Sequence, residues 1–124
     1  MILVDTSVWI QHLRAGSATL THLLEDGQVL GHPAVVGELA LGRLRRRDEV
    51  LWLLDRLPQA TRATETEVRA LIERHELREC GIGYVDAQLL AAGRLTCVPL
   101  WTSDRHLAEA ASRLGGAFDP GNAA

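Results

Sequence analysis

The sequence contains no lysine, since all thirteen of its basic residues are arginine. This absence excludes chemistry that needs a lysine, including the phosphate-binding lysine of P-loop enzymes. It also excludes receiver domains and haloacid-dehalogenase-like phosphatases, which rely on a lysine near their acids. Cysteine is scarce too: Cys80 and Cys97 form no Cys-x-x-Cys pair, and the five histidines have no metal-ligand spacing. A zinc site or a redox motif is therefore poorly supported.

Long hydrophobic runs are also missing. No stretch of about 18 apolar residues is present, as a membrane span would need, and the N-terminus lacks the pattern of a signal peptide. We therefore expect a cytoplasmic protein with no membrane partner. The net charge of −3 means that the protein lacks the overall positive charge typical of nucleic-acid-binding proteins. With 124 residues, 47% of them hydrophobic, the chain is expected to form a single domain over residues 1–124.

Short apolar segments alternate with longer segments of helical periodicity. Strands are expected at residues 2–4, 28–31, 60–65, 98–104 and 117–119. Helices are expected at residues 6–14, 17–26, 33–45, 48–57, 66–77, 84–95 and 105–115. This alternation predicts an α/β fold, with a parallel sheet covered by helices on both faces.

Four acidic residues stand at positions that such a fold would bring together. Asp5 and Asp104 directly follow two apolar strands, and the carboxyl ends of parallel strands meet at one edge of a sheet. Glu38 and Asp86 lie at the edges of apolar helical stripes, so they lean toward the packed face of their helices. We call these four residues the acid quartet and expect them to share one crevice.

Each member of the acid quartet also has a purely structural interpretation. Asp5 and Asp104 precede helices and are suitable caps for the free amide groups there. Asp86 is in the first turn of a helix, where a negative charge is favourable. Glu38 is close enough in sequence to form an ion pair with Arg43 or Arg45. Taken one at a time, these alternatives stay open.

Taken together, the four carboxylates point to a bound cation. Neighbouring carboxylates repel one another and raise each other's pKa unless a cation neutralises them. Oxygen ligands without histidine or cysteine suit Mg²⁺ or Mn²⁺ rather than zinc. Four hydroxyl residues flank the acids and could hydrogen-bond them or a bound phosphate, although helix capping is an equal alternative. This hydroxyl cluster is Thr6, Ser7, Thr102 and Ser103. The pattern therefore predicts a divalent-metal site for phosphate chemistry.

The densest basic segment follows Glu38 and consists of Arg43, Arg45, Arg46 and Arg47, which we call the arginine run. One interpretation is that it steers nucleic-acid phosphates toward the acids, with a steep dependence on salt. The alternative is a solvated helix end that is favoured by the helix dipole.

Four segments resemble, in order, the acidic motifs of PIN-domain ribonucleases, and more specifically those of the VapC toxins of bacterial VapBC toxin–antitoxin pairs. They are "ILVDTSVWI" with Asp5, "VVGELALG" with Glu38, "GIGYVDAQLLAA" with Asp86 and "LWTSDRHL" with Asp104. The resemblance covers nearly the whole chain. It implies a PIN-like three-layer α/β/α fold with a central, mainly parallel sheet of about five strands.

The resemblance also implies a function. It suggests an endoribonuclease that depends on Mg²⁺ or Mn²⁺, holds the metal on the acid quartet, cleaves structured RNA such as tRNA or rRNA, and so inhibits translation. A metal lowers the pKa of bound water, and no lysine or histidine is an obvious base for the RNA 2′-hydroxyl. Water is therefore the expected nucleophile, and the expected products carry a 5′-phosphate and a 3′-hydroxyl.

The expected partners come from the resemblance alone. They are a homodimer, a VapB-like antitoxin whose C-terminal segment enters the active-site groove, and a higher assembly with that antitoxin. Two other functions stay open from the residues themselves. One is a catalytically silent PIN-like module that binds RNA or protein, and the other is a metal-dependent phosphatase acting on small phosphoesters.

Overall fold

The computed structural model describes residues 1–122 and contains a parallel sheet. Its strands are β1 (Ile2–Val4), β2 (Val29–Leu30) and β3 (Leu100–Trp101), in the spatial order β2-β1-β3. Leu3 pairs with Leu30 on one side and with Leu100 on the other, so β1 is the central strand. All of β1 is buried, as its uninterrupted apolar sequence predicts. The predicted parallel α/β architecture is confirmed.

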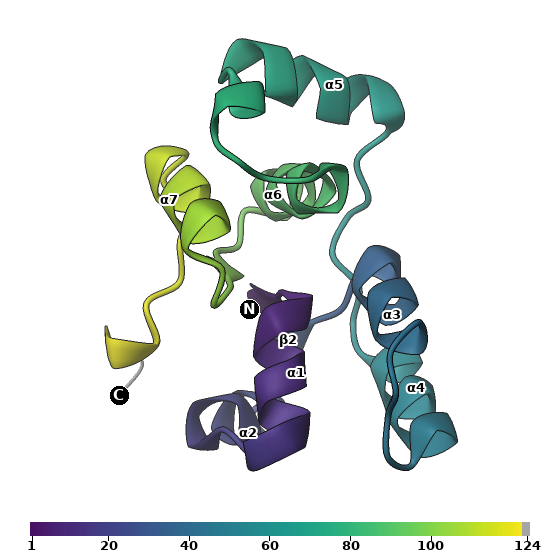
Figure 1. Cartoon of the computed structure of the whole chain (residues 1–124). Coiled ribbons are helices and arrows are strands. Elements are labelled where there is room, and N and C mark those ends of the chain that lie inside the picture. Colours follow the sequence, from purple (N-terminus) through teal and green to yellow (C-terminus); the bar gives the residue numbers. More distant parts are fainter. Residues whose placement is uncertain (123–124) are drawn as a thin grey trace.

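Helices connect and cover these strands (Figure 1). They are α1 (Thr6–Ala15), α2 (Ala18–Glu25), α3 (Pro33–Ala40), α4 (Arg47–Arg56), α5 (Glu65–Arg74), α6 (Tyr84–Thr96) and α7 (Arg105–Arg113), with two 3₁₀ turns, η1 (Leu77–Glu79) and η2 (Pro120–Asn122). Figure 1 shows α6 between α5 and the strands, with α3 and α4 on one side and α7 on the other. Within the described part of the chain, no helix is long and apolar enough to cross a membrane.

The two edge strands of the expected five-stranded sheet are each reduced to a single β-bridge. Gln59 forms an isolated parallel bridge with Gly31, and Ala117 forms another with Leu100. The predicted strand at 60–65 is therefore wrong, because the chain leaves the sheet after Ala60, and the amide of Thr61 donates to Thr96 Oγ1 at 2.9 Å. Likewise, the predicted strand at 117–119 is limited to the single bridge at Ala117.

The third helix is shorter than expected, because α3 ends at Ala40 rather than near Arg45. Arg47 stabilises this helix end, because its guanidinium group donates to the carbonyl oxygens of Ala40 and Gly42. These bonds satisfy carbonyls that the end of a helix leaves without partners. Arg46 adopts a left-handed conformation (φ 51°) directly before α4. Most of the arginine run therefore lies in the turn between α3 and α4 and not on a helix end.

Candidate active site

Asp5 follows β1 directly and is almost fully buried, with 5% of its surface exposed. Its Oδ2 atom accepts hydrogen bonds from Ser7 Oγ and Thr102 Oγ1, both at 2.7 Å, and from the Ser7 amide at 3.4 Å. The last of these contacts makes Asp5 the N-cap of α1, so the capping interpretation of Asp5 is confirmed and Thr6 and Ser7 do not cap this helix.

The two hydroxyls that hold Asp5 also hold the loop that carries Asp104. Ser7 Oγ accepts the amide of Ser103 at 2.9 Å, and Thr102 Oγ1 accepts the amide of Asp104 at 3.0 Å. Each hydroxyl thus donates a hydrogen bond to Asp5 and accepts one from a backbone amide of the loop after β3. Asp104 Oδ1 in turn accepts the Leu107 amide at 3.0 Å and caps α7. The positions of Asp5 and Asp104 are therefore fixed relative to each other.

Glu38 joins this region through α3, which packs against α1. Its Oε1 atom accepts a hydrogen bond from Thr6 Oγ1 at 2.6 Å. In the described residues Glu38 forms no ion pair with Arg43 or Arg45, so the ion-pair interpretation is wrong. The Glu38 carboxylate is oriented instead by a hydroxyl next to Asp5.

Asp86 lies in the first turn of α6, and its Oδ2 atom accepts the amide of Gly83 at 3.1 Å. Burial raises the pKa of the Asp86 carboxyl above its ordinary value, whereas the Gly83 hydrogen bond acts to lower it. The negative charges of Asp5, Glu38 and Asp104 raise the pKa of Asp86 further. All four carboxylates are thus close enough for the other three to act on Asp86.

The acid quartet shares one arrangement of its oxygens. In each carboxylate one oxygen accepts protein hydrogen bonds, and within residues 1–122 the second oxygen accepts none. The donor set consists of hard oxygen ligands, which is the chemistry that Mg²⁺ and Mn²⁺ prefer. Across the same residues, no group of three or more His, Cys, Asp or Glu side chains is placed so that it could hold a metal ion as it stands.

The remaining predicted residues separate into two groups. Thr6, Ser7 and Thr102 bond directly to acids of the quartet, whereas the Ser103 hydroxyl donates to Gln11 Oε1 at 2.8 Å. All four members of the arginine run are exposed, but Arg47 also donates to carbonyl oxygens at the end of α3.

Gln11 was missed by the sequence analysis. It lies one helical turn after Ser7 on α1, so the two side chains share a face toward the loop after β3. The i, i+4 spacing from Ser7 was the available signal. Its partner Ser103 is 92 positions away in sequence, which made the contact itself invisible.

Comparisons with known proteins agree with this geometry. The family model of the PIN domain matches residues 2–113. Ribonuclease VapC32 of Mycobacterium tuberculosis, in strains CDC 1551 / Oshkosh and ATCC 25618 / H37Rv, is 48% identical over 116 residues, which cover 93% of this chain and 94% of the relative. The crystal structure of FitAcB from Neisseria gonorrhoeae has the same fold, with a TM-score of 0.66 at 20% identity over 98% of this chain and 99% of that one.

The chain belongs to the PIN-domain family. Within that family its similarity is to the VapC type, as its four acidic motifs predicted.

Proposed function

We propose that this chain is a divalent-metal-dependent endoribonuclease and that its acid quartet holds one or two Mg²⁺ or Mn²⁺ ions. The activity class, an RNA-cleaving toxin of a toxin–antitoxin pair, accords with the VapC type of the chain. The observation that carries the finer proposal is that hydrogen bonds hold one oxygen of each of four carboxylates from four separate segments, and the charges of the other three act to raise the pKa of Asp86. Such a concentration of negative charge is costly unless a cation offsets it.

Mg²⁺ is one of the two cations that we propose for these oxygen ligands. It usually keeps several waters and binds through one or two carboxylates together with substrate phosphates. A site of four carboxylates, each with one oxygen engaged and one available, is consistent with that mode of binding. When bound, a divalent cation supplies a water nucleophile at neutral pH and offsets negative charge at the phosphate.

The chain's own residues provide orientation. Ser7 and Thr102 hold the Asp5 carboxylate in place and fix the loop that begins α7. Thr6 sets the orientation of Glu38. Because no lysine exists in the chain, we propose that water rather than the RNA 2′-hydroxyl is the nucleophile. The products would then be a 5′-phosphate and a 3′-hydroxyl.

The remaining parts of the proposal concern the surroundings of the site. We propose structured RNA, such as tRNA or rRNA, as the substrate, with Arg43, Arg45 and Arg46 attracting its phosphates. We further propose a cytoplasmic protein with residues 1–124 as one PIN domain, which forms a homodimer and a higher assembly with a VapB-like antitoxin.

The test is RNA cleavage by antitoxin-free protein in Mg²⁺ or Mn²⁺, compared with the same protein in EDTA. Asp5→Asn should abolish cleavage, because it removes one negative charge from the quartet. Asp55→Asn is the matched control, since Asp55 is an exposed acid on α4 outside the quartet. Cleavage that persists in EDTA, or a 2′,3′-cyclic phosphate product, would contradict the mechanism. Hydrolysis of small phosphoesters without any RNA cleavage would favour the phosphatase alternative.

A further inference from the structure

A small apolar pocket lies directly beside Asp86. It has a volume of about 160 Å³, and its lining includes the buried side chains of Leu77 and Ala87 together with the exposed residues Arg78, Gly83 and Tyr84. Gly83 connects the pocket to the site, because its amide donates to Asp86 Oδ2 at 3.1 Å. Gly83 therefore both lines the pocket and holds the Asp86 carboxylate.

The rim of this pocket carries an exposed aromatic ring. Tyr84 is the first residue of α6 and the only tyrosine in the chain, and 47% of its surface is exposed. It is not among the residues of the hydrophobic core. Its ring is therefore available to a ligand at the mouth of the pocket.

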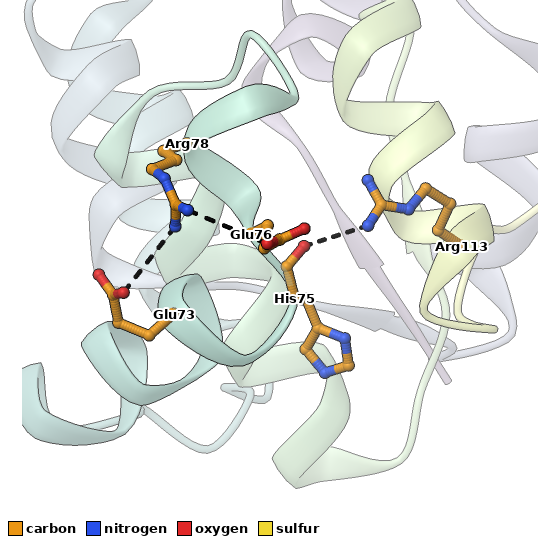
Figure 2. Close-up of polar contacts among 5 residues, drawn as sticks. All are labelled: Glu73, His75, Glu76, Arg78 and Arg113. Atoms are coloured by element: carbon orange, nitrogen blue, oxygen red, sulfur yellow. Dashed lines mark hydrogen bonds and ion pairs between the residues drawn. The ribbon is translucent and has the colours of Figure 1, made fainter.

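Arg78 supplies a second flat group at the same rim. Figure 2 shows its guanidinium group beside two carboxylates, with nitrogen–oxygen distances of 3.9 Å to Glu73 and 4.0 Å to Glu76. These contacts are long and the side chain is 56% exposed, so they orient the guanidinium without saturating its donors.

The backbone that carries Arg78 is anchored to a different helix. Arg113 of α7 donates to the His75 carbonyl oxygen at 3.1 Å, as Figure 2 also shows, and its guanidinium contacts Cys80 Sγ at 3.0 Å. The segment between α5 and α6 is thus fixed on both sides of Arg78. A rim that is held in place before binding loses less entropy when a ligand arrives.

We propose that this pocket binds one nucleobase of the RNA substrate next to the cleaved phosphate, with the base stacked on Tyr84 and flanked by Arg78. Aromatic rings and guanidinium planes are the surfaces on which unstacked RNA bases are held. The volume is well below the roughly 300–1,000 Å³ of pockets that enclose drug-sized molecules, so one planar ring system is a suitable occupant. The inference rests on the proposed nuclease function, because Asp86 is what places the pocket beside the phosphate.

The single tyrosine provides a direct probe. Protein labelled with 3-fluorotyrosine contains one fluorine signal, from Tyr84. The labelled Asp5→Asn variant is titrated with a single-stranded oligoribonucleotide and with a base-free ribose-phosphate oligomer of equal length. Binding of each is followed in parallel by fluorescence anisotropy. We expect the normal RNA to shift the fluorine resonance and the base-free oligomer to leave it in place.

Two substitutions carry the inference into catalysis. Tyr84→Phe keeps the ring and is the matched control, whereas Tyr84→Leu keeps apolar bulk but removes the stacking surface. Loss of one stacked base costs on the order of 5- to 150-fold, so Tyr84→Leu should slow cleavage of a mixed-sequence RNA pool about fivefold or more. It should also weaken any base preference next to the cut, while Tyr84→Phe stays within about twofold of the wild type. Circular dichroism establishes that both variants are folded.

The outcomes separate this inference from the function on which it rests. If the wild-type protein cuts RNA in Mg²⁺ and bound RNA leaves the Tyr84 resonance unmoved, the nucleobase pocket is wrong and the nuclease function stands. An equal shift with the base-free oligomer means that Tyr84 meets the RNA backbone, which also overturns the pocket. If the protein neither binds nor cuts RNA, the proposed function fails and this inference fails with it.

Discussion

Replacing Asp86 by asparagine is expected to stabilise the cation-free protein while weakening its response to Mg²⁺. Burial and the charges of the other three acids raise the pKa of Asp86 in the folded state. A carboxyl with a raised folded pKa is protonated more readily in the folded than in the unfolded chain. Its ionised form therefore destabilises the fold once the pH exceeds that folded pKa. Asparagine removes the charge, and its Oδ1 atom can still accept the Gly83 amide.

The expected size of the effect is modest, because Asp86 is only half-buried and solvent screens its charge. Relief of an unfavourable charge typically contributes about 0.5–2 kcal/mol. For a chain of 124 residues the entropy of unfolding is about 0.26 kcal/mol/K, so a gain of about 1 kcal/mol raises Tm by about 4 °C. The gain should disappear below about pH 3.8, the ordinary pKa of the side chain, where the carboxyl is protonated in both states.

The assay is thermal unfolding in EDTA at neutral pH for the wild type, Asp86→Asn and the control Asp55→Asn, repeated with excess Mg²⁺. Mg²⁺ that binds the folded state raises Tm, so the wild type should gain stability and Asp86→Asn should gain much less. The control should behave as the wild type does in both conditions. An Asp86→Asn protein that melts below the wild type in EDTA would refute the reasoning, because the carboxylate would then be a net stabiliser of α6.

Three further perturbations test other parts of the structure. Thr102→Val leaves Asp5 without one of its hydrogen-bond donors. It should lower the free energy of unfolding by about 1–3 kcal/mol in denaturant titrations and slow cleavage. Thr102→Ser, which keeps the hydroxyl, should retain most of the stability and most of the activity. Burial and the charge of Arg62 lower the pKa of His32, whose Nδ1 atom caps α3, so folding stability should fall as the pH drops below 6.5. His32→Asn, which can still cap, should flatten that fall when unfolding by urea is followed between about pH 5 and pH 8. Converting Arg43, Arg45 and Arg46 to glutamine should weaken RNA binding and flatten its salt dependence with Tm unchanged. Arg47→Gln should instead lower Tm and leave the salt dependence as it is.

Local sequence signals were sufficient for the architecture, and they led to the acid quartet as a candidate site. The run Ile2–Val4 is apolar at every position, so it predicts a central strand, and Asp5 follows it without a spacer. The same reasoning applies to Trp101 and Asp104, which are separated by two hydroxyl residues. The periodicity of α6 correctly predicted that Asp86 leans toward the packed side of its helix, where it is partly buried. The same prediction for Glu38 on α3 is wrong, because Glu38 is exposed.

The errors in helix and strand boundaries arose where a residue distant in sequence bonds to the end of the element. The sequence after Ala40 does not indicate that the Arg47 side chain donates to the carbonyl oxygens of Ala40 and Gly42 at the end of α3. The chain leaves the sheet near Thr61, where the Thr61 amide donates to Thr96 Oγ1, 35 positions away in sequence. Sequence periodicity indicates which face of one helix or strand is buried. It does not indicate hydrogen bonds between different segments, such as these.

The structure also changes how capping and catalysis should be weighed for acids of this kind. Asp5 and Asp104 each cap a helix that begins just after a strand, so a cap there lies at the carboxyl edge of the sheet. The capping bond engages one carboxylate oxygen and leaves the other without a protein partner in the described residues. Capping therefore orients the acid that the site needs. The two interpretations, which are alternatives for a single acid, become compatible once several such caps meet at one sheet edge.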